Sequence, residues 1–307
     1  MSSIRLNKYD TLKGVLILLV ILGHLIAAHV GTVFSKIAVF GIYAFHMPLF
    51  MTLTGKFARF KPLDALLYLL LFGLFDAWFI GVTAVFYLLL PLFARIKSEK
   101  GQIAIVLGGI VAGLLFGFIP LSLHEAVTRC VTFLPYFLIG YYNLLEKRPI
   151  KHTKLIGVLL ILFTAFPLPL LCQNVPVPLY MCDGYGNHFI WHRIIAYLVG
   201  IAWTWWLLTV TTNKKVPVFT KMGQYTLWVY LLHEFTMPLM FKMMAYINAL
   251  VGQTLFTTQL AVSILWFFLL WMPAIALQKG TQWLMKKWKP VNQKLAAKCM
   301  PKKDANE

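Results

Sequence analysis

The stretch DTLKGVLILLVILGH, residues 10–24, decides the fold, because it sets an acid, a base and a histidine into an otherwise apolar run. Such a run predicts a membrane-spanning helix, since a bilayer core of about 30 Å needs about twenty apolar residues. On this helix Lys13 and His24 fall within about 20° of one face and about 16 Å apart along the axis. Asp10 lies near the same face. The first helix therefore presents an acid, a base and an imidazole to one side.

The composition of the whole chain places it in a membrane. It is 60% hydrophobic and 12% charged, with a mean hydropathy of +0.76, which excludes an ordinary soluble domain. The net charge of +18 does not indicate nucleic acid, because the basic residues gather in short loops between apolar runs. They are expected to set the topology and to contact membrane lipids. We find no Gly-rich phosphate loop, no metal-spaced Cys/His cluster and no nucleic-acid module, so neither a metal nor a nucleic-acid partner is predicted.

Apolar periodicity predicts an all-α, polytopic membrane protein with about ten transmembrane helices. An even number of spans puts both termini on one side of the membrane. Residues 1–280 are predicted to form the membrane domain, and residues 281–307 a basic cytoplasmic tail. The ten spans are expected at 12–30, 37–55, 62–76, 78–94, 102–119, 127–145, 154–171, 189–210, 224–247 and 256–278.

Charge asymmetry predicts the orientation. With both termini in the cytoplasm, the inner segments hold 24 of the 28 basic residues, as the positive-inside rule requires. Four basic residues do not lie in the inner segments but on the outer side or within spans, so their positions need another explanation. They are Lys36, Arg129, Arg193 and Lys242.

Two features of the chain bear on its processing. The first apolar run is followed by LIAAHVGT, residues 25–32, which lacks a small-x-small cleavage site, so we expect a retained helix rather than a signal peptide. Cys172 and Cys182 flank a loop that is expected to be external. The two residues either form a disulfide or remain free thiols, and the sequence does not decide between these alternatives. Cys130 and Cys299 are expected to be unpaired.

Ionisable residues at membrane depth are costly, so they usually face the bundle interior and mark a pathway or a site. His24 is the clearest case, although a neutral histidine bonded to a neighbouring helix is the alternative. Lys13 either snorkels to the inner interface or meets an anionic ligand from the cytoplasm. Asp10 pairs with Lys13 or favours the helix N-terminus electrostatically.

The second span contains FHMPLFMTLTG, residues 45–55, in which Pro48 removes a backbone donor and Gly55 allows close helix approach. A kinked, partly polar helix of this kind suits a cavity wall. His46 is either a core histidine beside the kink or a second catalytic group.

Polar and aromatic residues also gather near the predicted external ends. Arg129 either anchors at the interface or binds a polar ligand. Trp191 and Arg193, in CDGYGNHFIWHR (residues 182–193), suit sugar recognition, although an interfacial belt has the same composition. His233 and Glu234 are adjacent in the ninth span, where structural hydrogen bonding is the favoured role.

Four segments resemble motifs of the acyltransferase-3 family of integral membrane acyltransferases. The family's first helix carries an arginine, ten residues and a histidine, which Lys13 and His24 match with lysine in place of arginine. FHMPLFMTLTG resembles the second-helix motif. TRCVTFLPYFLIGYY (128–142) and GQYTLWVYLLH (223–233) resemble segments of the branch similar to fucose 4-O-acetylases. The four matches follow the family's order and cover most of the chain.

The resemblance implies a membrane O-acyltransferase, by expectation an acetyl-CoA-dependent O-acetyltransferase, with no further cofactor. Such a protein moves an acyl group from cytoplasmic acyl-CoA to a hydroxyl of a carbohydrate or cell-surface polymer on the outer side. It also implies a multi-pass protein of a bacterial cytoplasmic membrane. Lysine at position 13 keeps the charge but loses bidentate phosphate recognition, and Thr226 replaces the usual serine.

The mechanism expected from these residues uses His24 as general base, since burial disfavours the charged imidazole and leaves it able to accept a proton. Lys13, held by Asp10, is placed to neutralise phosphates of the donor, because about 16 Å is comparable to a pantetheine arm. His46 or Arg129 is expected to stabilise the oxyanion or seat the acceptor, together with Arg193 and Trp191. Direct transfer and an acyl-histidine intermediate are both open.

The alternative function is a transporter or flippase for a lipid-linked glycan or small solute, because kinked helices and intramembrane charges occur there as well. A transporter has no need for the Lys13 to His24 spacing, which favours the enzyme. A non-catalytic scaffold is disfavoured by the cost of its buried ionisable residues. The acceptor, acyl groups other than acetyl and the oligomeric state are not specified by the sequence.

Overall fold

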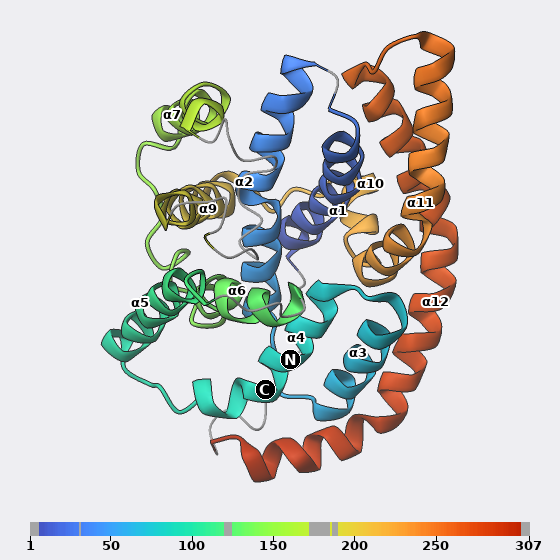
Figure 1. The fold of residues 1–307 in the computed structure, drawn as a ribbon. Helices are drawn as coiled ribbons and strands as arrows, with labels where there is room; N and C mark the ends of the chain where they lie inside the picture. The colour runs from blue at the N-terminus through green and yellow to red at the C-terminus, as the bar shows by residue number, and fades with distance from the viewer. Residues whose placement is uncertain (1–5, 31, 120–124, 172–184, 186–189, 302–307) are drawn as a thin grey trace. The chain divides into compact units, whose positions relative to one another are not determined.

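The computed structural model describes residues 6–30, 32–119, 125–171, 185 and 190–301, and this part of the chain is helical without strands (Figure 1). The helices of this part are α1 (Asn7–Ala28), α2 (Val33–Lys56), α3 (Pro62–Phe75), α4 (Trp78–Phe93), α5 (Glu99–Phe116), α6 (Glu125–Tyr141), α7 (Thr153–Ala165), α8 (Pro167–Leu171), α9 (Ile190–Val210), α10 (Pro217–Met222), α11 (Thr226–Val251) and α12 (Phe256–Cys299). The predicted all-α class is confirmed.

Each predicted span overlaps one helix, except that the span predicted at 154–171 overlaps two, α7 and α8. Within the described part of the chain, six segments are long and apolar enough to cross a membrane, namely α1, α2, α5, α7 with α8, α9 and α12. Three shorter apolar helices lie in α3, α4 and α6. The structure thus supports a multi-pass membrane protein, whereas the number of ten spans and the orientation of the termini stay predictions.

Local sequence explains where several helices end. α3 ends at Phe75 because Asp76 adopts a left-handed conformation, with φ of 51°, and α4 follows two residues later. α7 ends before Pro167, since a proline has no backbone N–H with which to continue the helical hydrogen bonds. α12 continues well beyond the predicted span, through the basic segment to Cys299.

The chain forms two compact units, which are described separately. Unit 1 comprises residues 1–50, 149–179 and 202–279, and unit 2 comprises residues 51–148, 180–201 and 280–307. Helices α2, α9 and α12 contribute residues to both units.

In unit 1, α1 packs against α10 and α11 (Figure 1). Gly14 and Gly223 allow α1 and α10 to approach closely. A methyl group at Gly14 would overlap backbone atoms of Phe219, and one at Gly223 would overlap backbone atoms of Asp10. The hydroxyls of Thr11 and Thr220 form a hydrogen bond of 2.8 Å across the same interface. The start of α1 is therefore held directly against α10.

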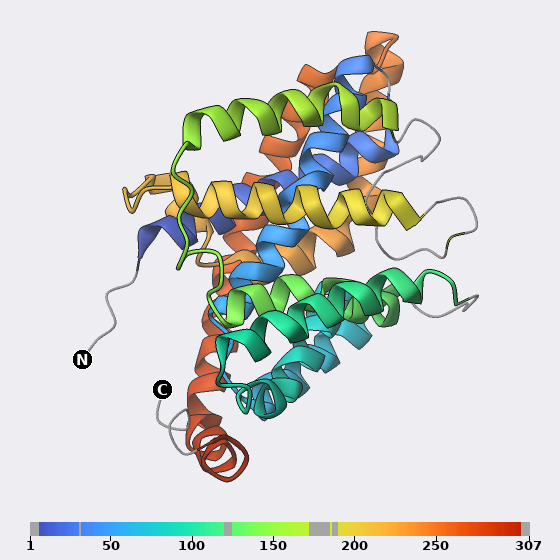
Figure 2. The ribbon, with the colours of Figure 1, turned by 90° about the vertical axis from the view of Figure 1, so that its left-hand side faces the viewer.

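In unit 2, α5 lies along α6, as Figure 2 shows. The first part of α9 is tied to α6 by two tyrosines. Tyr197 donates to the carbonyl of Thr132 at 2.9 Å, and Tyr136 donates to the carbonyl of Ala196 at 3.1 Å. α4 also packs against α3 and α6. Unit 2 is thus a helical bundle with hydrogen-bonded tyrosines in its core.

Candidate functional site

A pair of histidines from α1 and α11 forms the centre of the candidate site in unit 1. The ring centroids of His24 and His233 lie 5.4 Å apart, and the ring planes are tilted by 42°. His24 is half-buried, whereas the side chain of His233 is 0% exposed. The pair therefore has one member that is accessible and one that is enclosed by the helices.

The hydrogen bonding of His233 fixes its neutral tautomer. Its Nδ1 lies 2.5 Å from the carbonyl oxygen of Tyr230, and a carbonyl only accepts, so Nδ1 carries the hydrogen. The Nε2 atom of neutral His233 then has a lone pair. This atom is buried and has no hydrogen-bond partner among the residues that the structure describes. This lone pair lies in the cluster that His233 forms with His24 and Glu234.

Glu234 adds a carboxylate to this pair. Its Oε1 lies 3.7 Å from Nε2 of His233, and one ligand atom from each of His24, His233 and Glu234 lies within 4.8 Å of the others. Two imidazoles and a carboxylate are donors that divalent transition metals accept. The sequence predicted no metal and gave His233 and Glu234 a structural role, so their proximity to His24 is a new finding.

The remaining predicted residues of the first helix lie on α1 itself. α1 is continuous from Asn7 to Ala28, so the helical spacing of Lys13 and His24, about 16 Å along the axis, holds in the structure. Asp10 is buried at 5% exposure, and Lys13 is half-buried. Both residues lie in the part of α1 that packs against α10.

His46 lies in the unit 1 part of α2 and is buried at 4% exposure. Its Nδ1 donates to the carbonyl of Ile42 at 2.7 Å, and its ring meets Tyr43 edge-on with centroids 4.9 Å apart. α2 continues through Pro48, as the sequence led us to expect for a kinked helix. These contacts fit a core histidine, and the catalytic role for His46 is untested.

The predicted acceptor residues belong to unit 2, whereas the histidine pair belongs to unit 1. Arg129 is buried, with its guanidinium 4.2 Å from the ring centroid of Trp78. Arg193 donates from Nη1 to the carbonyl of Gly113 at 2.7 Å, which fastens α9 to α5. Trp191 is 37% exposed. The structure therefore gives Arg193 a packing role that the sequence did not predict.

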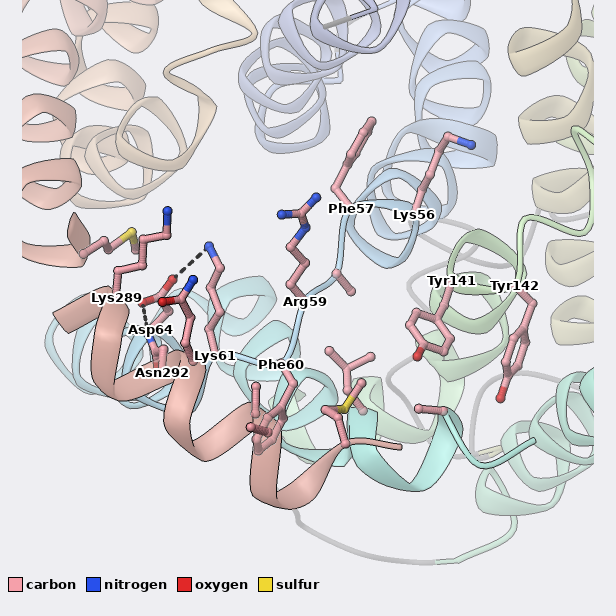
Figure 3. Close-up of a pocket in the computed structure, with 18 of the residues that line it drawn as sticks. Lys56, Phe57, Arg59, Phe60, Lys61, Asp64, Tyr141, Tyr142, Lys289 and Asn292 are labelled. Carbon is pink, nitrogen blue, oxygen red and sulfur yellow. Dashed lines mark hydrogen bonds and ion pairs between the residues drawn. The ribbon is translucent and has the colours of Figure 1, made fainter. Parts of the chain in front are cut away.

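Unit 2 also contains a cavity of about 1080 Å³ (Figure 3). It lies where helix ends meet: the end of α2, the start of α3, the end of α4, the start of α5 and the end of α6, together with the last part of α12. The cationic side chains that line it are Lys56, Arg59, Lys61, Lys97, Lys286 and Lys289. We call this space the basic cavity. Asp64, also in its lining, accepts hydrogen bonds from Nε1 of Trp288 at 2.8 Å and from Nδ2 of Asn292 at 3.0 Å, which fastens the start of α3 to α12.

Comparison with known proteins assigns the chain to a family. The family model described as an acyltransferase domain, that of the acyltransferase-3 family, matches residues 62–277. The chain belongs to the acyltransferase-3 family. Neither the curated proteins nor the solved structures gave a match. The chain is therefore a membrane acyltransferase of this family, while its placement in the fucose 4-O-acetylase branch stays a prediction.

The matched range covers only part of the acyltransferase-3 site that the sequence predicts. It includes Arg129, Trp191, Arg193 and His233 but begins after α2, so it includes neither Lys13 nor His24. His233 could have been found from the sequence, because it ends the family-like segment GQYTLWVYLLH. The basic cavity gave no such signal, since its lysines also satisfy the positive-inside rule.

Proposed function

We propose that the chain is a membrane O-acyltransferase that moves an acetyl group from acetyl-CoA to a hydroxyl of a carbohydrate or cell-surface polymer, across a bacterial cytoplasmic membrane. Membership of the acyltransferase-3 family supports the reaction class. The observation that carries the proposal is the half-buried imidazole of His24 beside the enclosed lone pair of His233. A base with an oriented partner is what hydroxyl activation requires.

In this reaction His24 removes the proton from the acceptor hydroxyl as its oxygen attacks the thioester carbonyl. The carbon–sulfur bond then breaks, the CoA sulfur leaves and takes up a proton, and the acyl ester is released. In the imidazolium form of His24 both ring nitrogens carry hydrogens. Ligand atoms of His24, His233 and Glu234 lie within 4.8 Å of one another, so a small movement of the His24 ring would let the Nε2 lone pair of His233 accept one of these hydrogens, and the carboxylate of Glu234 offsets the positive charge.

The first turns of α1 serve the donor in this proposal. Lys13 supplies a positive charge for the phosphates of CoA, and the contact with α10 holds this part of α1 in place. The spacing of about 16 Å to His24 leaves room for the pantetheine arm. Arg129, Arg193 and Trp191 are assigned to the acceptor, and His46 to the oxyanion.

The test is acetyl transfer from labelled acetyl-CoA in inverted membrane vesicles with a panel of glycan acceptors. His24→Ala is expected to abolish transfer while the protein inserts normally. His152→Ala is the matched control, because His152 is an exposed histidine of unit 1 at the start of α7. Full activity of His24→Ala would overturn the mechanism, and no transfer by the intact protein would favour the transporter.

A further inference from the structure

The cluster of His24, His233 and Glu234 has the side chains of a transition-metal site. Each residue offers one ligand atom, and the three atoms lie within 4.8 Å of one another. Two imidazole nitrogens and one carboxylate oxygen match the protein ligands of open zinc sites, in which a water or a substrate takes the fourth position. Mg²⁺ and Ca²⁺ prefer oxygen ligands, so the two nitrogens favour a transition metal. The composition of the cluster therefore indicates an ion such as Zn²⁺.

The spacing of the ligand atoms is close to that of a tetrahedral site. Around Zn²⁺, with ligand distances of about 2.0–2.2 Å, neighbouring ligand atoms lie about 3.4 Å apart. Nε2 of His233 and Oε1 of Glu234 are 3.7 Å apart. The ring centroids of His24 and His233 are 5.4 Å apart, and those of two imidazoles on one tetrahedral ion would be about 5 Å apart. Small side-chain rotations therefore bring the three ligand atoms to one ion.

His233 is held in the tautomer and orientation that a metal ligand requires. Its Nδ1 donates a hydrogen bond to the carbonyl oxygen of Tyr230 at 2.5 Å, so Nε2 carries the lone pair. Metal-binding histidines nearly always donate from their second ring nitrogen to a backbone carbonyl or a carboxylate in this way. Nε2 is also buried without a hydrogen-bond partner among the described residues, whereas most buried polar atoms have one. A bound ion would satisfy this atom.

The packing of two helices fixes the cluster and leaves it accessible to an ion. His24 lies on α1, and His233 and Glu234 are neighbours on α11, which packs against α1 within unit 1. The side chain of His233 is 0% exposed, whereas that of Glu234 is 16% exposed and His24 is half-buried. The enclosed His233 therefore sets the position of the site, and the other two ligands give an ion a route to it.

We propose that His24, His233 and Glu234 bind Zn²⁺ and that the bound ion inhibits acyl transfer. Coordination uses the lone pair of His24, which then cannot accept the proton of the acceptor hydroxyl. It also uses the Nε2 lone pair of His233, so the partner of the base is lost as well. The inhibition rests on the proposed function, in which His24 is the base, whereas metal binding does not.

Metal binding is measured with Co²⁺, a spectroscopic substitute for Zn²⁺, on the full-length protein in detergent after removal of metals. We expect the strong visible absorption of tetrahedral Co²⁺, which Zn²⁺ removes by competition and Mg²⁺ does not. Glu234→Gln keeps the side-chain shape but loses the anionic ligand, and His233→Asn keeps a donor toward Tyr230 but loses Nε2. Each variant should lose the absorption and weaken Zn²⁺ binding by at least about tenfold. His152→Ala, which changes an exposed histidine outside the cluster, is the matched control and keeps both.

Inhibition is measured as acetyl transfer by the same detergent-solubilised protein at rising Zn²⁺ concentrations. The rate of the parent protein should fall as the site fills and recover when a chelator is added. The Zn²⁺ concentration that halves the rate should be at least about tenfold higher for Glu234→Gln and unchanged for His152→Ala. Each rate is compared with the metal-free rate of the same variant, so a lower basal rate of Glu234→Gln does not affect the result.

Three outcomes would overturn the proposal. They are the absence of a tetrahedral Co²⁺ spectrum in the parent protein, an unchanged spectrum in Glu234→Gln or in His233→Asn, and transfer that Zn²⁺ leaves unchanged or stimulates. The second outcome would assign the metal to histidines outside the cluster. Failure of the proposed function appears differently, as metal binding that both variants abolish in a protein that transfers no acetyl group even without metal.

Discussion

Replacing Gly14 by alanine is expected to destabilise unit 1 through backbone overlap. A methyl group there would meet the carbonyl oxygen, carbonyl carbon and Cα atom of Phe219 in α10. These are backbone atoms, so they cannot rotate away as a flexible side chain can. α10 must move from α1, which strains the hydrogen bond between Thr11 and Thr220.

The size of the destabilisation follows from comparison with Gly108, a glycine that has free space around it. Alanine in a helix interior is favoured over glycine by about 1 kcal/mol, and both Gly14 and Gly108 lie inside helices. Nothing lies within 4 Å of a methyl group added at Gly108. The overlap at Gly14 adds a cost of about 1–3 kcal/mol, typical of overpacking. The difference between the two variants is therefore about 1–3 kcal/mol in the free energy of unfolding.

Thermal unfolding of the purified variants in detergent measures this difference. The unfolding temperature of Gly108→Ala should equal or exceed that of the parent protein. The unfolding temperature of Gly14→Ala should be several degrees lower than that of Gly108→Ala. Gly223→Ala should behave like Gly14→Ala, because its methyl group would meet the backbone of Asp10. Equal unfolding temperatures for Gly14→Ala and Gly108→Ala would refute the close approach of α1 and α10.

Three further substitutions test the site. Lys13→Arg should keep activity because the charge remains, whereas Lys13→Glu should raise the KM for acetyl-CoA; equal kinetics of both variants would remove Lys13 from donor binding. His233→Asn keeps a donor toward Tyr230 but loses the Nε2 lone pair, so kcat should fall by at least about tenfold at unchanged KM; an unchanged kcat would leave His233 a purely structural role. Arg193→Met loses the bond to Gly113 and should lower unfolding stability by about 1.5–3 kcal/mol, as measured by thermal unfolding; an unchanged unfolding temperature would contradict the packing role.

The sequence predicts the helices well, because apolar runs and local stop signals are short-range properties. The shared face of Lys13 and His24 also follows from helix geometry alone. The pairing of His24 with His233 does not, since it depends on how α1 packs against α11. Structural hydrogen bonding is the role that the sequence favours for His233. The hydrogen bond from its Nδ1 to the carbonyl of Tyr230 is present, but it also leaves a lone pair on the buried Nε2 atom.

The basic cavity shows a second limit of sequence reasoning. Each of its lysines satisfies the positive-inside rule, so charge counting gives no reason to bring residues 56–61 and 286–289 together. Their approach depends on α12, of which the sequence predicts only a span at 256–278, followed by a basic tail at 281–307. The helix continues because the following residues are mostly good helix formers such as lysine, glutamine, leucine and alanine. The possible pairing of Cys172 with Cys182 lies outside the described residues.

The attachment of α3 to α12 has a consequence for biosynthesis. Asp64 receives its hydrogen bond from Asn292, which follows it by 228 residues in the chain. At about 5–20 residues per second, the ribosome needs about 11–46 s to produce that partner. During this interval the start of α3 has been synthesised without Trp288 and Asn292, the two residues of α12 that donate hydrogen bonds to Asp64. The attachment of α3 to α12 therefore forms only after nearly the whole chain has been translated.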